Sequence, residues 1–306
     1  MLRKLIIIAG PTATGKTSIA IHLAQLLDGE VISADARQLY RFMDIATAKP
    51  TGDETAAAVH HGLDLRLPDE PYSAGEFTRF ARAKAAEIWE RGKTPIVAGG
   101  TGLYIQALLD GLRTEERPSS SARAAIRERL RSKGLASLYA ELGRLDPVAQ
   151  SRVAANDTQR VLRALELVGN SPTGPVEGWD PMPEAAVCFC LHRPRDELDR
   201  RIGERIEQMA AQGLVAETEQ LVRLGYGRDT PAMQTLGYEE MLDYLEGRCP
   251  LESALGRIRL RTRQFAKRQI TWFRRDRRYR WLDISRWGRE GVAERMVMEY
   301  RNRRRF

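Results

Sequence analysis

Cysteine and long apolar runs are scarce in this 306-residue chain, and each scarcity excludes a class of protein. Three cysteines are too few for a zinc site, and we expect all of them to be small hydrophobic residues in a reducing compartment: Cys188, Cys190 and Cys249. No run of about 18 apolar residues is present, so no membrane span is expected. Met1 to Lys4 lead directly into a predicted strand, which leaves no room for a signal or transit peptide. We therefore expect a cytoplasmic protein.

Acidic residues are fewer than basic ones in this chain. Its 49 Lys and Arg residues against 41 Asp and Glu residues give a formal net charge of +8, with an isoelectric point near 9.6. This favours an anionic partner but by itself only weakly implies nucleic acid. Hydrophobic residues make up 42% of the chain, enough for a large core. The length predicts one large α/β body with an insertion or a second lobe.

The strongest motif is a glycine loop near the amino terminus. The run Gly10-Pro11-Thr12-Ala13-Thr14-Gly15-Lys16-Thr17 follows the apolar stretch 5–9, precedes an amphipathic helix and matches G-x-x-x-x-G-K-[ST]. Backbone N–H groups of such a loop converge on a polyphosphate. Lys16 adds a positive charge, and the Thr17 hydroxyl can ligate Mg²⁺. ATP is the commonest ligand of this motif, but any diphosphate satisfies the same geometry.

Polar residues follow the next two predicted strands. Residues 30–35 read as a buried strand that ends in Asp35-Ala36-Arg37-Gln38, and residues 94–98 run into Gly99-Gly100-Thr101-Gly102. In open parallel sheets, ligands sit beyond the carboxyl ends of the strands. We therefore expect Asp35 and Thr101 to face the crevice of the glycine loop. Asp35 has three candidate roles there: a neighbour of magnesium, a ribose contact or a general base.

Helical patterns without strands occupy residues 115–185. We predict helices over 122–132, 135–142, 147–154 and 158–168, a proline-rich loop, and a return to the sheet at Ala186. The predicted fold class is α/β, with a P-loop NTPase-like parallel sheet core, a helical insertion domain and a helical C-terminal region. The core is expected to comprise residues 1–114 and 186–306, and the insertion residues 115–185.

A long basic helix is predicted from Leu251 through Arg280. Arginine and lysine residues are spread around it and are interleaved with Phe265, Trp272 and Phe273. This mixture favours an electrostatic groove for single-stranded or looped nucleic acid. A helix that is half core and half solvated surface is the alternative. His60 and His61 are expected in a loop and are not predicted to form a metal pair.

Several segments together resemble one family, the tRNA dimethylallyltransferases, also called isopentenyltransferases. The matching segments follow the family's order over nearly the whole chain: residues 10–17, 32–40, 43–50, 72–74, 99–105, 156–160, 163–166, 234–240 and 263–273. Two positions depart from the family pattern. Ala36 stands where the family usually has serine, and Ala46 where it usually has glycine.

The resemblance implies transfer of a dimethylallyl group from dimethylallyl diphosphate to the exocyclic amine of adenosine at position 37 of certain tRNAs. Residues 10–17 would hold the diphosphate with magnesium, Asp35 would act as general base, and Thr101 would contact the reacting centre. A monomer that binds the anticodon stem-loop is expected. The implied tRNA contacts are Asp35, Ala36, Arg37, Gln38, Thr101, Arg123, Gln159, Arg160, Val161, Leu162 and Arg163.

Two other functions fit the glycine loop. A P-loop kinase of a small metabolite or nucleoside would use ATP as donor, with Asp35 as the base for a hydroxyl, and would not need the arginine-rich helix. A non-catalytic nucleic-acid-binding NTPase would bind its ligand without Asp35. ATP turnover by the purified protein would distinguish these functions from prenyl transfer.

Overall fold

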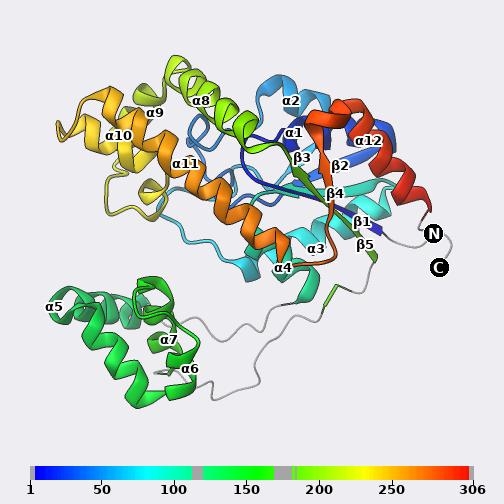
Figure 1. The fold of residues 1–306 in the computed structure, drawn as a ribbon. Coiled ribbons are helices and arrows are strands. Elements are labelled where there is room, and N and C mark those ends of the chain that lie inside the picture. The colour runs from blue at the N-terminus through cyan, green and yellow to red at the C-terminus, as the bar shows by residue number, and fades with distance from the viewer. Residues whose placement is uncertain (1–3, 112–119, 169–180, 183–184, 303–306) are drawn as a thin grey trace. The chain divides into compact units, whose positions relative to one another are not determined.

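The computed structural model describes residues 4–111, 120–168, 181–182 and 185–302. The chain forms two compact units: Met1–Asp110 with Pro181–Phe306, and Gly111–Asp180. The larger unit contains a sheet with helices around it, and the described part of the smaller unit is helical (Figure 1).

A six-stranded parallel sheet forms the centre of the larger unit, in the order β3-β2-β4-β1-β5-β6. The strands are β1 (Lys4–Ala9), β2 (Gly29–Ser33), β3 (His60–His61), β4 (Thr94–Gly99), β5 (Ala185–His192) and β6 (Arg280–Asp283). Every residue of β1 is buried, because helices cover both faces of the sheet. This burial explains the continuous apolar run in the sequence. The predicted α/β class is confirmed.

Helices cover the two faces of the sheet in separate clusters. On one face, α3 and α4 pack through Phe77 and Leu108, and on the other, α1 and α12 pack through Leu23 and Val292. Helices α8 to α11 extend this unit beyond the sheet (Figure 1). The helices of the larger unit are α1 (Lys16–Leu27), α2 (Gly52–Ala57), α3 (Ala74–Glu90), α4 (Gly102–Asp110), α8 (Arg195–Ala211), α9 (Leu214–Arg223), η1 (Pro231–Gln234), α10 (Tyr238–Leu245), α11 (Leu251–Arg274) and α12 (Ile284–Asn302).

The smaller unit has its own hydrophobic core. Its helices are α5 (Ser120–Leu145), α6 (Pro147–Ser151) and α7 (Thr158–Val168). Gly134 interrupts α5 with φ 74° and ψ 165°, so this element consists of two helices, near the predicted 122–132 and 135–142. Leu138, Leu142 and Val161 are fully buried between them. The predicted start of the insertion, residue 115, lies outside the described residues.

Two local predictions need correction. The basic helix ends at Arg274 and not beyond Arg280, because Arg280 begins β6, which pairs with β5. His60 and His61 form the edge strand β3 and not a loop. His61 Nε2 lies 2.7 Å from the buried carboxylate of Glu30, and His60 Nδ1 lies 2.7 Å from the Ala58 carbonyl, so the two rings have separate partners. Cys188 and Cys190 are buried in β5, and Cys249 is half-buried.

None of the helices within the described ranges is both long and apolar enough to cross a bilayer. The longest described helices, α5, α11 and α12, all carry many charged residues.

Gly99 gives the first testable prediction. A Cβ at this position would lie 2.1 Å from the carbonyl oxygen of Ala34, a backbone atom of the neighbouring strand's end. Gly99→Ala should lower the free energy of unfolding by about 1–3 kcal/mol or more, because the two backbones must separate. Gly256→Ala is the control, since Gly256 lies in the second turn of α11 and its Cβ would meet nothing within 4 Å. It should raise stability by about 0.5–1 kcal/mol. Equal effects of the two substitutions in denaturant titrations would contradict this explanation.

Candidate functional site

A cavity of about 1240 Å³ opens in the larger unit, where β1, β2 and β4 end. The glycine loop, the turn after β2 and the turn after β4 all contribute to its lining, as do side chains from α8 and α11. Three predicted site segments therefore share one cavity: residues 10–17, 35–38 and 99–102. Each segment follows a parallel strand, which is the cause of their convergence.

The glycine loop takes a conformation that few residue types adopt. Gly10 and Gly15 have φ of 144° and 100°, and Ala13 lies in the left-handed region with φ 63°. A Cβ on Gly10 would lie 2.6 Å from the carbonyl oxygen of Leu191, so only glycine fits there. Thr14 Oγ1 and Lys16 Nζ both donate to the Pro11 carbonyl at 2.8 Å, which closes the loop. The loop leads directly into α1, whose first N–H groups favour an anion.

Lys16 is half-buried at the base of this loop. Burial lowers the pKa of its ammonium group from 10.5 to about 8, the nearby Asp35 carboxylate opposes this shift, and the cation of Arg205 adds to it. A polyphosphate would supply the negative charge that this environment lacks.

Arginines of α8 and of the turn before it surround the same loop. Arg193 Nε donates to the Thr14 carbonyl (3.1 Å), and Arg201 Nε donates to the Ala13 carbonyl (2.9 Å). Arg205 reaches the Thr12 hydroxyl at 3.4 Å, and burial lowers the pKa of its guanidinium. Arg201 and Arg205 line the cavity, so the loop faces several fixed cations. These side chains were not predicted, although Arg201 and Arg205 are four residues apart on α8 and hence share one helix face.

Asp35 and Thr101 are joined through the backbone between them. Asp35 Oδ1 accepts the N–H of Arg37 at 2.9 Å, and Thr101 Oγ1 accepts the N–H of Ala36 at 2.9 Å. A threonine hydroxyl that accepts from the backbone keeps its own proton to donate to a ligand. The contact of Ala36 is made by its N–H, so it does not need a serine hydroxyl. The cavity thus has a carboxylate and a hydroxyl donor beside the phosphate loop.

The side chains of Arg37 and Gln38 contact different parts of the protein. The Arg37 guanidinium lies 5.0 Å from the centre of the Phe265 ring on α11, and burial lowers its pKa while Asp35 opposes this. Gln38 is engaged within the protein. Its Oε1 accepts the hydroxyl of Ser33 (2.9 Å), and its Nε2 donates to the Ala48 carbonyl (2.9 Å). Gln38 therefore holds the segment 43–50 against the end of β2.

Five predicted tRNA contacts lie on α7, and a sixth on α5, of the smaller unit. Gln159 and Arg160 are exposed on α7, and Arg163 forms an ion pair with Glu166 (3.2 Å). Leu162 packs against the unit's core. The side chain of Val161 is fully buried in that core, so it stabilises the helix and does not reach the surface. Arg123 belongs to α5, but its side chain lies outside the described residues.

The oxygen atoms of this cavity could bind magnesium only together with oxygen atoms of a bound phosphate compound. Thr17, in the first turn of α1, and Asp35 both line the cavity and offer the oxygen atoms that magnesium prefers. Within residues 4–111, 120–168, 181–182 and 185–302, no group of three or more His, Cys, Asp or Glu side chains could hold a metal on its own. Phosphate oxygens would have to supply most of the ligands.

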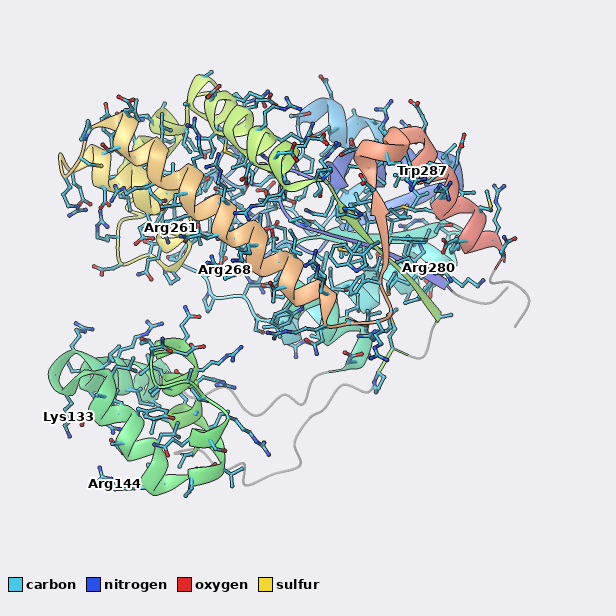
Figure 2. All side chains as sticks on the ribbon, in the orientation of Figure 1. Lys133, Arg144, Arg261, Arg268, Arg280 and Trp287 are labelled. Atoms are coloured by element: carbon cyan, nitrogen blue, oxygen red, sulfur yellow. The ribbon has the colours of Figure 1, made fainter. Side chains whose placement is uncertain are left out.

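Helix α11 carries the basic residues that the sequence indicated (Figure 2). Several of them are neutralised by neighbours; Arg261, for example, donates to Glu239 and Glu240. Others on the helix or just after it form no ion pair with another described residue: Lys267, Arg268, Arg275 and Arg277. These exposed cations remain available to an anionic partner.

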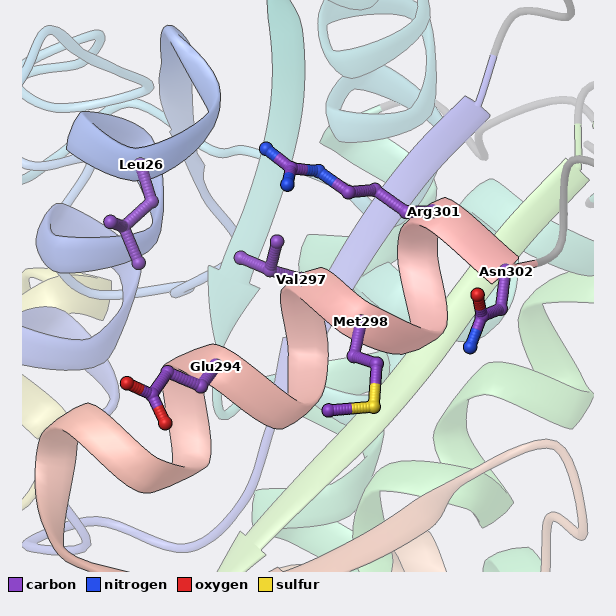
Figure 3. Close-up of a pocket in the computed structure, with 6 residues that line it drawn as sticks. All are labelled: Leu26, Glu294, Val297, Met298, Arg301 and Asn302. Carbon is purple, nitrogen blue, oxygen red and sulfur yellow. The ribbon is translucent and has the colours of Figure 1, made fainter.

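A second hollow of about 400 Å³ lies between α1 and α12 (Figure 3). It is lined by Leu26, Glu294, Val297, Met298, Arg301 and Asn302. None of the predicted site residues lies there, so the larger cavity is the candidate active site.

Family models match most of the chain. The model described as IPP transferase covers residues 38–276, and the one described as isopentenyl transferase covers residues 3–66. The tRNA dimethylallyltransferase of Syntrophobacter fumaroxidans is 41% identical over 300 residues, which is 96% of this chain and 87% of that protein. The corresponding protein of Carboxydothermus hydrogenoformans is 39% identical, over 98% of each chain.

Solved structures agree with these relatives. The tRNA isopentenylpyrophosphate transferase of Bacillus halodurans superposes with a TM-score of 0.71 at 35% identity, over 98% of this chain and 99% of that one. A eukaryotic dimethylallyltransferase, described as acting on tRNA, superposes with a TM-score of 0.79 at 28% identity, over 96% of this chain and 78% of that one. The chain belongs to the tRNA dimethylallyltransferase (isopentenyl transferase) family.

Proposed function

We propose that this enzyme transfers the dimethylallyl group of dimethylallyl diphosphate to the N6 amine of adenosine 37 in tRNA. The new bond joins N6 to the allylic carbon, the bond from that carbon to the diphosphate oxygen breaks, and N6 loses one proton. The observation that carries the proposal is one cavity in which a cation-lined phosphate loop adjoins the linked pair Asp35 and Thr101. The relatives' names support transfer, and nothing in the comparisons supports the kinase.

The residues divide the reaction between them. The N–H groups of residues 13–17, with Lys16 and Arg205, stabilise the charge that gathers on the leaving diphosphate. Thr101 donates its hydroxyl near the oxygen that leaves. Asp35 accepts the N6 proton, and no strong base is needed because the amine becomes acidic as its lone pair forms the new bond. Thr17, with Asp35 nearby, would hold magnesium, which would spread the negative charge of the diphosphate.

The tRNA must present its adenosine unstacked. An unpaired base of the anticodon loop costs less to extrude than a paired one, which suits a reacting centre that lies inside a cavity. The exposed cations of α11 would bind the RNA backbone. The residues that the proposed reaction uses all belong to this chain, so the reaction needs no second subunit, and we propose a monomer. A tRNA substrate agrees with the expected cytoplasmic location.

The base is tested with Asp35→Asn. The amide cannot accept the proton, so kcat should fall by about 10²–10⁴-fold, while the affinity for the anticodon stem-loop should change little. Label from dimethylallyl diphosphate entering the RNA is the measurement. Asp69→Asn, at an exposed loop carboxylate, is the control and should be silent. Transfer that survives Asp35→Asn would leave the function standing and remove Asp35 from the mechanism.

Lys16 makes donor binding depend on pH. With its pKa lowered to about 8, Lys16 carries a charge below that pH and loses it above. A bound diphosphate favours the charged form, so its affinity should decline as pH rises beyond about 8. Titration calorimetry with magnesium diphosphate across roughly two pH units on either side of that value measures the effect. Lys16→Arg cannot titrate in this range and should abolish the decline; a decline that persists in this variant would assign it to another group.

The cations of α11 predict a salt dependence. Removing one phosphate contact should reduce the slope of log affinity against log salt by about 0.7–0.9. Lys267→Gln should therefore weaken stem-loop binding most at low salt and flatten the slope by about that amount. Arg223→Gln is the comparison, because Glu219 lies 3.8 Å from that guanidinium and offsets its charge. Equal slopes for wild type and Lys267→Gln would show that Lys267 does not contact an RNA phosphate.

A further inference from the structure

One buried side chain joins the glycine loop to the turn after β4, and the mechanism above does not use it. Gln269 of α11 is 6% exposed. The Thr12 N–H donates to its Oε1 (2.9 Å), and its Nε2 donates to the Gly100 carbonyl (2.9 Å). Both ends of the amide are thus satisfied by backbone groups from two different loops.

The turn after β4 lacks side chains where α11 lies against it. A Cβ on Gly100 would lie 2.2 Å from Gln269 Nε2, and a Cβ on Gly102 would lie 2.2 Å from Trp272 Cδ1. Gln269 and Trp272 are three residues apart on α11 and share a face. Thr101 stands between the two glycines, so α11 fixes the turn that carries it.

We propose that Gln269 is a positioning residue that sets the spacing between the diphosphate in residues 10–17 and the reacting centre beside Thr101. This inference rests on the proposed function for its chemistry. Gln269 acts through Thr12 and Gly100, whose backbone groups it holds. Transfer requires the leaving oxygen, the allylic carbon and the amine to be aligned, and a displacement of about 1 Å can cost about 10²-fold in rate.

A neutral amide suits this place better than a charged group. It presents an N–H donor to the Gly100 carbonyl and a carbonyl acceptor to the Thr12 N–H, and it leaves the positive charge around the diphosphate intact. A carboxylate could accept from Thr12 but would repel the Gly100 carbonyl. A protonated carboxyl group could replace the amide fully, because it has an O–H donor and a carbonyl acceptor.

A glutamate at this position therefore distinguishes a positioning role from a merely structural one, because only its protonated form can replace the amide. In Gln269→Glu, burial and the facing Gly100 carbonyl raise the pKa of the new carboxyl group and outweigh the Thr12 N–H, which favours the carboxylate, so the group becomes neutral as pH falls. The ratio of the variant's kcat to that of wild type should be about tenfold or more below one at about pH 8.5. It should rise towards one as pH falls to about 5.5. For Gln269→Leu, the ratio of its kcat to that of wild type should be equally low at every pH.

Gln264→Glu is the matched control, on the same helix but exposed, and its ratio should stay flat. A flat ratio for Gln269→Glu, or full kcat in Gln269→Leu, would overturn the proposal. Gly100→Ala is an independent variant if Gln269→Leu does not fold. Its Cβ would displace the Gln269 amide without altering Gln269, and it should reproduce the reduction of kcat at every pH.

Hydrogen exchange and diphosphate binding separate this inference from the proposed function. In Gln269→Leu the amides of residues 10–17 and 99–102 should exchange faster than in wild type, and magnesium diphosphate should bind several-fold more weakly. Neither measurement requires the protein to catalyse transfer of the dimethylallyl group. If wild type transfers nothing while these changes occur, the proposed function falls and the link between the loops stands. Unchanged exchange and binding would refute the link itself.

Discussion

Half-buried cations around one cavity are the physical constraint on which this structure depends. Lys16, Arg37 and Arg205 all have pKa values lowered by burial, and Asp35 is the carboxylate that opposes the shift in each case. Glu240 also opposes the shift of Arg37, and Glu54 that of Arg205, but desolvation remains the largest cause for all three cations. The free protein therefore carries an electrostatic cost at this cavity. A diphosphate would remove that cost. The positive charge that destabilises the free protein would therefore favour the binding of a polyanionic donor. It would also stabilise a leaving diphosphate.

The order of the strands turns this charge into a reactive site. The chain forms β1, β2 and β4 in sequence, but in the sheet β4 lies between β2 and β1. The turn after β4, with Thr101, thus lies between Asp35 and the glycine loop. The Ala34 carbonyl, which accepts from the Thr101 N–H at 3.2 Å, and the Ala36 N–H, which donates to the Thr101 hydroxyl, tie the two turns together. The strand order and these two hydrogen bonds, one between backbone groups and one from a backbone N–H to the Thr101 hydroxyl, thus bring Asp35 and Thr101 together beside the glycine loop.

Much of this could be predicted from local sequence, and the remainder depends on distant contacts. The glycine loop, the buried strands and the positions of Asp35 and Thr101 follow from patterns within short stretches of the chain. Arg201 and Arg205 look like solvated charges of an amphipathic helix, and only the packing of α8 turns them towards the loop. Gln269 meets Thr12 across 257 positions of sequence. Strand β6 is hidden in an arginine-rich stretch, because its pairing with β5 and not its composition makes it a strand.

The segment 43–50 shows how a departure from the family pattern constrains a distant residue. Glu217 of α9 accepts the N–H groups of Asp44 and Ile45 and the hydroxyl of Tyr238, and so holds this wall of the cavity to α9 and α10. A Cβ on Gly237 would lie 2.8 Å from the Ala46 methyl, and Gly237 has φ 103°. Residue 237 must therefore be glycine for two independent reasons, backbone conformation and the methyl that Ala46 adds. With glycine at position 46 only the first reason would remain, so the extra methyl makes this wall of the cavity less tolerant of change.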